Sequence, residues 1–231
     1  MLIGPQNLTL HVNHVRSRIR SAANAAGRDP ATVTLVAVTK AKTAETVRLA
    51  ATAGVTDFGE NYLQEALAKM DQLADLPLQW HFIGCIQSNK TRAVAERFDW
   101  VHSVDRLNIA RRLSEQRPFH ARPLNVCIQV ALVPEPTKGG VAPDALLGLA
   151  KAVAELPHLR LRGLMCVPPP QPTPKDERAV FARLKVALEG LNAGGLKLDT
   201  LSMGMSGDFE SAIAEGATLV RIGTALFGSR S

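Results

Sequence analysis

Cysteine and aromatic residues are scarce in this sequence. Its 231 residues include three cysteines, Cys85, Cys127 and Cys166, and none of them forms a C-x-x-C pair. Three separated cysteines without matching histidine spacings argue against a disulfide framework and against structural zinc. Aromatic residues make up 4% of the chain and are mostly Phe in apolar stretches, which disfavours an RNA-binding sheet with exposed stacking rings. We therefore expect reduced thiols, no metal and no nucleic-acid partner.

Long apolar runs are also absent. No stretch approaches the ~18 uninterrupted apolar residues of a membrane-spanning helix, because each one ends at Lys, Arg, Gly or Pro. The first residues lack a charged start followed by an apolar block of about 7–15 residues, so no secretory signal is visible. We expect a cytoplasmic protein that has no membrane partner.

The sequence does have enough apolar material for one sizeable core. Apolar residues make up 46% of the chain and charged residues 21%, and the length fits one barrel-sized domain better than two large domains. Lys and Arg number 27 against 21 Asp and Glu, so the net charge is +6. This surplus could attract nucleic acid, anionic lipid or a phosphorylated small molecule. The basic residues are scattered, so charge alone does not choose among these ligands.

One local pattern repeats along the chain: a short β-branched or apolar run, a polar or glycine-containing turn, and a helical period. An amphipathic helix over 7–28 precedes the repeats. Strands are predicted over 33–39, 55–58, 79–83, 100–102, 124–131, 161–165, 200–202 and 219–222. Helices are predicted over 44–53, 64–74, 89–97, 106–116, 144–155, 175–191 and 209–215.

Strands that alternate with helices predict right-handed βαβ crossovers and a parallel sheet. Eight units in a chain of this size favour an α/β fold of the (β/α)8 TIM-type barrel class over an open doubly wound sheet. The predicted domain is single, covers 1–231, and consists of a leading helix within 1–28 and a barrel over 33–228. The Pro-rich stretch 168–174 is predicted to be a stiff rim loop, with a polyproline ligand as the alternative.

Functional residues of such a barrel belong at the carboxyl ends of its strands. Lys40 follows the first strand directly, in the segment VAVTK. An amine at the mouth of an apolar core is partly desolvated, which lowers its pKa, favours the neutral nucleophile and suits Schiff-base chemistry. The alternative is that the long Lys40 side chain merely carries its ammonium group to water.

Two glycine-containing turns follow the last two strands, SMGMSGD at 202–208 and RIGT at 221–224. In barrels, the loops after these strands commonly bind phosphate through unpaired backbone N–H groups and a helix N-terminus. Ser206 and Thr224 could add hydroxyl donors. The alternative is ordinary helix capping by Ser206 or Asp208.

Three further rim residues are less decisive. Arg221 could bind a carboxylate, pair with a neighbouring acid, or meet the pyridine nitrogen of a cofactor and discourage its protonation. Asn61 is an ordinary helix N-cap candidate, and His81 has apolar neighbours typical of a hydrogen-bonded core histidine.

Several segments together resemble the pyridoxal phosphate homeostasis protein family. The resemblance runs in order over most of the chain. Its segments are VAVTK at 36–40, FGENYLQE at 58–65, HFIGCIQSNK at 81–90, GLM at 163–165, LSMGMSGD at 201–208 and VRIGTALFG at 220–228.

The resemblance implies a single barrel similar to the N-terminal domain of alanine racemase and of eukaryotic ornithine decarboxylase. It also implies pyridoxal 5'-phosphate (PLP) as cofactor, bound through Lys40 as a Schiff base. The implied pocket has phosphate contacts from Ser206, Gly223 and Thr224, the pyridine-facing Arg221, and Asn61, His81 and Met205 in its lining. Thr39 and Thr43 replace the more usual Ser and Pro around Lys40, and Thr39 keeps a hydroxyl there.

The function implied by the resemblance is intracellular PLP homeostasis. Members of the family are thought to hold or buffer the cofactor or deliver it to PLP-dependent apo-enzymes, without an established turnover, so no catalytic residue is assigned. We expect a monomer. The alternative is a PLP-dependent amino acid racemase with weak activity. It is disfavoured because Tyr62, the only tyrosine, does not occupy the place of the racemase's second acid/base, and because no second β-domain follows the eighth unit.

Overall fold

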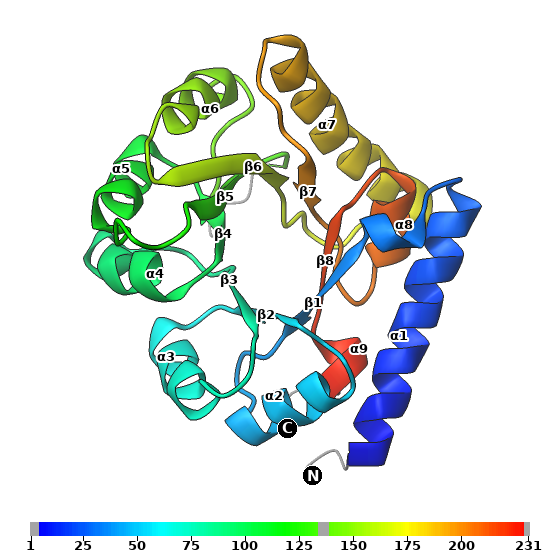
Figure 1. Ribbon diagram of the computed structural model, residues 1–231. Helices are drawn as coiled ribbons and strands as arrows, with labels where there is room; N and C mark the ends of the chain where they lie inside the picture. Colours follow the sequence, from blue (N-terminus) through cyan, green and yellow to red (C-terminus); the bar gives the residue numbers. More distant parts are fainter. Residues whose placement is uncertain (1–4, 134–138, 229–231) are drawn as a thin grey trace.

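The computed structural model describes residues 5–133 and 139–228, and its eight parallel strands close into a barrel in chain order (Figure 1). The strands are β1 (Thr34–Val38), β2 (Asp57–Glu60), β3 (Gln79–Phe82), β4 (Trp100–Val104), β5 (Leu124–Gln129), β6 (Leu159–Met165), β7 (Thr200–Ser202) and β8 (Leu219–Ile222). Each strand pairs with the next, and β8 pairs with β1 to close the sheet. The predicted (β/α)8 barrel is therefore confirmed.

Helices surround the barrel on its outside (Figure 1). They are α1 (Pro5–Ala25), α2 (Ala44–Thr52), α3 (Leu63–Gln72), α4 (Thr91–Arg97), α5 (Leu107–Gln116), α6 (Leu146–Ala154), α7 (Pro174–Ala193), α8 (Phe209–Ala214) and α9 (Thr224–Phe227), with 3-10 turns η1 (Pro30–Thr32) and η2 (Ser88–Lys90). Local chemistry sets several starts: the Thr43 hydroxyl accepts from the Thr46 N–H ahead of α2, and the Thr173 hydroxyl accepts from the Asp176 N–H ahead of α7.

The leading helix α1 fills a gap in the outer layer. It packs against α8, α9 and α2, beside the short helix that follows β8 (Figure 1). The buried residues Leu8, Val12, Val15, Ile19 and Ala23 recur at three- and four-residue steps, which gives the helix one apolar face toward the barrel. The predicted amphipathic helix is confirmed, and it completes the ring of helices.

Element boundaries differ from the predictions in three places. The second strand covers Asp57–Glu60 rather than 55–58: Gly59 and Glu60 pair with β3 despite their weak strand propensity, while Val55 packs into the core ahead of the strand. The helix predicted over 144–155 begins at Leu146, and the one predicted over 89–97 opens with the 3-10 turn η2. Residues 1–4, 134–138 and 229–231 of the predicted domain lie outside the described residues.

Alternation along the strands separates two buried layers. On β8, Val220 and Ile222 belong to the apolar core between sheet and helices, so Leu219 and Arg221 face the barrel interior. On β1, Ala37 belongs to the outer core, and Val36 and Val38 face inward. The interior is therefore built from a second set of side chains, and several of them are polar.

Candidate functional site

Lys40 lies in a tight turn directly after β1. Its backbone neighbour Ala41 has φ +60°, a left-handed conformation that is uncommon outside glycine. The Glu65 carboxylate of α3 accepts a hydrogen bond of 3.0 Å from the Ala41 N–H. The Lys40 side chain is half-buried. Held backbone strain of this kind concentrates at functional sites, so the turn presents Lys40 in a fixed direction.

A buried ion pair lies beneath this turn. Lys69 Nζ donates to Glu60 Oε1 and to the Thr39 carbonyl oxygen, each at 2.6 Å, and the Thr39 hydroxyl donates to the same Glu60 oxygen at 2.6 Å. The Lys69 and Glu60 side chains are 7% and 0% exposed. Burial raises the pKa of the Glu60 carboxyl, although Lys69 and Thr39 act in the opposite direction. The pair anchors Thr39, the residue before Lys40, to α3.

The turn after β7 is shaped by a glycine and an aspartate. Gly204 has φ +92°, and a Cβ there would lie 2.7 Å from the Ala212 Cβ, so this position requires glycine. The Asp208 carboxylate accepts a hydrogen bond of 2.6 Å from the Met205 N–H. Met205 is 36% exposed. Among the described residues we find no acceptor for the backbone N–H of Ser206 or Gly207, which leaves these donors at the rim.

The turn after β8 meets the turn after β7. The Ser206 hydroxyl accepts a hydrogen bond of 3.2 Å from the Ala225 N–H at the start of α9. A Cβ on Gly223 would lie 3.4 Å from the Val38 carbonyl oxygen, so the Gly223 turn lies beside the end of β1, two residues before Lys40. The predicted contact of the two glycine-containing turns is present, and both are adjacent to the Lys40 strand.

Arg221 is a buried cation inside the barrel. It is 4% exposed and donates to Ser202 Oγ at 2.6 Å and to the Cys166 carbonyl oxygen at 2.8 Å. Burial lowers its pKa, yet a guanidinium stays charged in proteins. Burial also raises the pKa of the Cys166 thiol to about 12, so this neighbour is a neutral thiol rather than a nucleophile.

Asn61 and His81 occupy different levels of the barrel. Asn61 follows β2 at the rim, and its Oδ1 atom is buried with no partner among the described residues. A Cβ on Gly84 would lie 2.1 Å from the Asn61 carbonyl oxygen, so Gly84 is needed for this close approach. His81 is inside the barrel, hydrogen-bonded to Asp57 and His102. Its place in a cofactor pocket stays a prediction.

The structure thus brings together Lys40, Ser206, Gly223 and Thr224 at the junction of β1, β7 and β8, with Arg221 inside the barrel on β8. The sequence interpretation missed the Glu60–Lys69 pair and the interior residues Ser202 and His102. A usable signal existed for the interior, because His81 and His102 each alternate with apolar residues of the outer core on neighbouring strands. The Glu60–Lys69 pair is nine residues apart and left no such pattern.

Metal and membrane chemistry find no support in the part of the chain that the structure describes. Within residues 5–133 and 139–228, no three His, Cys, Asp or Glu side chains group together in a way that could hold a metal ion. None of the described helices combines the length and the apolar character needed to cross a membrane. The site is therefore an arrangement of a lysine, an arginine, hydroxyls and backbone donors.

Comparison with known proteins agrees with this arrangement. The family model for the alanine racemase N-terminal domain matches residues 10–231. The chain is 64% identical to the pyridoxal phosphate homeostasis protein of Pseudomonas aeruginosa (95% of this chain, 94% of the relative) and 50% identical to that of Escherichia coli K12 (94% of each). It is 39% identical to the structure of PipY from Synechococcus elongatus with PLP bound, with a TM-score of 0.86 over 96% of this chain and 100% of PipY.

These matches extend over nearly the whole chain and over nearly the whole of each relative. They include the Lys40 turn and both turns that carry Ser206 and Gly223, since each lies within the matched length. The barrel, its closing strands and its rim thus have the same origin as those of the relatives. The chain belongs to the pyridoxal phosphate homeostasis protein family.

Proposed function

We propose that this chain binds PLP at the rim of the barrel and serves PLP homeostasis by holding the cofactor and delivering it to apo-enzymes. The observation that carries the proposal is the contact of the Gly223 turn with the end of β1, which brings an amine and an anion cradle to the same edge. The relatives' names and the PLP-bound PipY structure support the same cofactor.

The residues present fit this cofactor chemically. A phosphate needs backbone N–H donors and hydroxyls, and the turn residues Ser206, Gly207 and Thr224 offer both. Glycine at 207 leaves open space where a Cβ would stand. The buried Asn61 Oδ1 atom, which has no partner among the described residues, suits a hydroxyl of a ligand. The donor set of the rim therefore matches an anionic, hydroxylated ring compound.

Each residue has a distinct part in the proposal. When bound, the cofactor supplies an aldehyde that condenses with an amine and a phosphate that anchors it. Lys40 provides the amine, and the Ala41–Glu65 hydrogen bond orients its turn. Ser206, Gly223 and Thr224 bind the phosphate. Arg221 directs a permanent charge toward the ring nitrogen and so keeps that nitrogen unprotonated.

A carrier is favoured over the racemase alternative by the surroundings of the site. Racemisation requires an acid/base group on each face of the reacting carbon. Tyr62 is 53% exposed at the start of α3, and Cys166 is held as a neutral thiol. Neither is arranged as a proton donor. Incubation with a panel of amino acids tests the alternative, because turnover that disappears in Lys40→Ala would establish it.

The experiment that tests binding uses the purified protein loaded with PLP. We expect a yellow protein that carries a phosphopyridoxyl group on Lys40 after borohydride reduction, as read by peptide mass spectrometry. Lys40→Ala should lose the adduct. Lys42→Ala is the matched control, because Lys42 lies two residues on and donates to the Phe227 carbonyl oxygen at 3.2 Å. An adduct that persists in Lys40→Ala and vanishes in Lys42→Ala would reassign the site.

We also propose that the protein is a cytoplasmic monomer. Large exposed apolar side chains are scattered singly over separate elements, among them Leu10, Phe119 and Val186, and such scattering does not form a docking face. All three cysteines are free, which is typical of a reducing compartment. Light scattering during gel filtration tests the monomer, and a mass near twice 24.8 kDa would refute it.

A further inference from the structure

A row of polar side chains crosses the interior of the barrel. Arg221 Nη1 donates to Ser202 Oγ at 2.6 Å, and Ser202 Oγ lies 2.7 Å from His102 Nδ1. His102 Nε2 lies 2.9 Å from His81 Nδ1, and His81 Nε2 lies 3.0 Å from Asp57 Oδ1. Four consecutive hydrogen bonds thus join five side chains on β8, β7, β4, β3 and β2.

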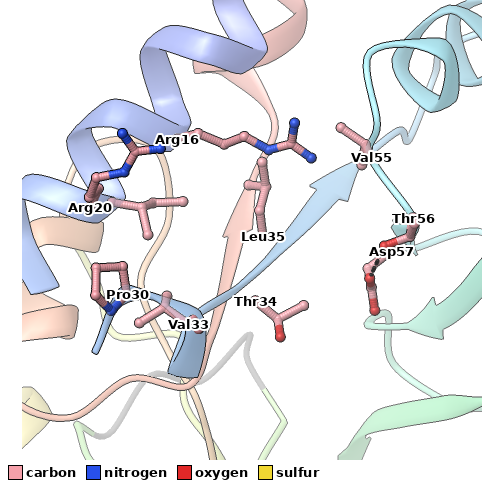
Figure 2. A pocket seen from close by; sticks show the side chains of 11 residues that line it. Arg16, Arg20, Pro30, Val33, Thr34, Leu35, Val55, Thr56 and Asp57 are labelled. Carbon is pink, nitrogen blue, oxygen red and sulfur yellow. Dashed lines mark hydrogen bonds between the residues drawn. The ribbon is translucent and has the colours of Figure 1, made fainter. Parts of the chain in front are cut away.

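The two ends of this row differ in environment. Arg221 is fully enclosed next to the rim, whereas the Asp57 side chain is 18% exposed at the opposite mouth of the barrel. There Asp57 lines a cavity of about 330 Å³ between α1 and the first residues of β1 and β2. Figure 2 shows Asp57 and Thr56 across this cavity from Arg16 and Arg20. The positive end is therefore buried, and the negative end meets solvent.

The chemistry of the ends fixes the direction of every bond between them. An arginine can only donate, and an ionised carboxylate can only accept. Burial opposes ionisation of Asp57, but hydrogen bonds from His81 and Thr56 outweigh it and lower the pKa of the carboxyl. Burial, with the nearby charges of His81 and Arg221, lowers the pKa of His102 far enough to keep its ring neutral.

With both imidazoles neutral, one proton arrangement satisfies all four bonds. Arg221 donates to Ser202, whose hydroxyl donates to His102 Nδ1; His102 Nε2–H donates to His81 Nδ1, and His81 Nε2–H donates to Asp57. The reverse arrangement would give Ser202 two donors and leave its own proton without an acceptor in the described chain. The His81 ring also stacks on Trp100, with centroids 5.6 Å apart, which limits its rotation.

We propose that Asp57, His81, His102 and Ser202 are positioning residues that hold the Arg221 guanidinium in place through one directed hydrogen-bond relay. Each member fixes the orientation of the next, as outer-shell partners do for metal-bound histidines. The consequence for the cofactor pocket rests on the proposed function, whereas the relay itself is a property of the chain without ligand. The relay makes Asp57, at the far mouth of the barrel, a determinant of the rim site.

The direct test is the tautomer of each histidine in the ligand-free protein. Long-range proton–nitrogen correlation spectra of histidine-labelled protein, assigned by single substitutions, should show His81 and His102 as neutral Nε2–H tautomers. In Asp57→Ala, His81 loses its fixed acceptor, so the His102 nitrogen shifts should move toward a mixture of tautomers. The exposed carboxylate Asp75 gives the control, and Asp75→Ala should leave both rings unchanged.

Two results would overturn the relay: either ring as an Nδ1–H tautomer in the wild type, or unchanged His102 shifts in folded Asp57→Ala. If Asp57→Ala does not fold, Ser202→Ala reads the relay from the other end, and unchanged His81 shifts would refute it. The dissociation constant for PLP should rise roughly tenfold in Asp57→Ala, the lower end of outer-shell effects. Wild-type protein that shows these tautomers without binding PLP would refute the proposed function and leave the relay intact.

Discussion

The substitution Lys69→Met tests whether the buried ion pair beneath the Lys40 turn stabilises the barrel. Lys69 Nζ lies 2.6 Å from Glu60 Oε1 and 2.6 Å from the Thr39 carbonyl oxygen. Methionine is flexible and apolar, so it fills much of the same space. The substitution therefore removes the cation while leaving the Glu60 carboxyl and the Thr39 carbonyl buried.

The expected loss follows from the burial of both partners. Removing one partner of a buried ion pair costs roughly 3–5 kcal/mol, because the other charge stays buried without compensation. Burial already raises the pKa of Glu60, so this carboxyl can take up a proton and avoid part of the penalty. We therefore expect a loss of about 3 kcal/mol in the free energy of unfolding, which corresponds to a fall in melting temperature of about 6–12 °C.

Urea unfolding followed by circular dichroism at neutral pH measures this loss. Lys185→Met is the control, because Lys185 and Glu189 form an exposed pair at 4.0 Å, and it should change the unfolding free energy by less than about 0.5 kcal/mol. Adding Glu60→Gln to Lys69→Met should recover about 1 kcal/mol or more, since no charge is then buried. The loss should also shrink toward acid pH as Glu60 protonates. A Lys69→Met effect as small as that of the control would refute the reasoning.

Three other predictions concern single residues. Gly204→Ala should lower the unfolding free energy by about 2 kcal/mol or more, because the new Cβ meets Ala212 and φ is +92°, whereas Gly207→Ala, with open space around it, should change it by less than about 0.5 kcal/mol; chemical denaturation compares the two. The folded-state pKa of Asp57 is lowered, so its stabilisation is present above the unfolded pKa and is lost as pH falls through the folded value; Asp57→Asn should therefore flatten the decline of stability between about pH 5 and about pH 3. A thiol reagent at mildly alkaline pH should modify Cys85 alone in the folded protein, since burial raises the pKa of both other cysteines to about 12, and modification of more than one thiol per chain would contradict this.

The features predicted correctly from the sequence are those that depend on neighbouring residues. Lys40 was assigned to a strand end because the apolar run before it has the period of a strand, and that run is β1. The two glycine-containing turns were recognised because their turn chemistry is local, and Gly204 has the positive φ that only glycine adopts freely. Barrel closure then follows from the number and order of the units, which places the first strand next to the last.

The features that were missed depend on contacts across the barrel. His102 and Ser202 are 100 residues apart in sequence, and each alone has the ordinary appearance of a buried polar residue. His81 was interpreted as a core histidine, and the hydrogen bonds that give it a further role come from two other strands. Sequence periodicity assigns a side chain to the interior, but it does not show which interior side chains meet.

The relay gives a physical reason why a charged arginine is tolerated inside the barrel. An isolated buried guanidinium would be costly, but Arg221 donates to a hydroxyl and a carbonyl, and the relay connects it to an ionised carboxylate at the solvent-facing mouth. Because the charge of Arg221 is permanent, a ring nitrogen next to it stays unprotonated and withdraws electrons weakly. Such a ring stabilises a carbanion poorly, so a side chain that fixes Arg221 also suppresses turnover. The residues that hold Arg221 in place would thus help to keep this barrel a carrier of its cofactor.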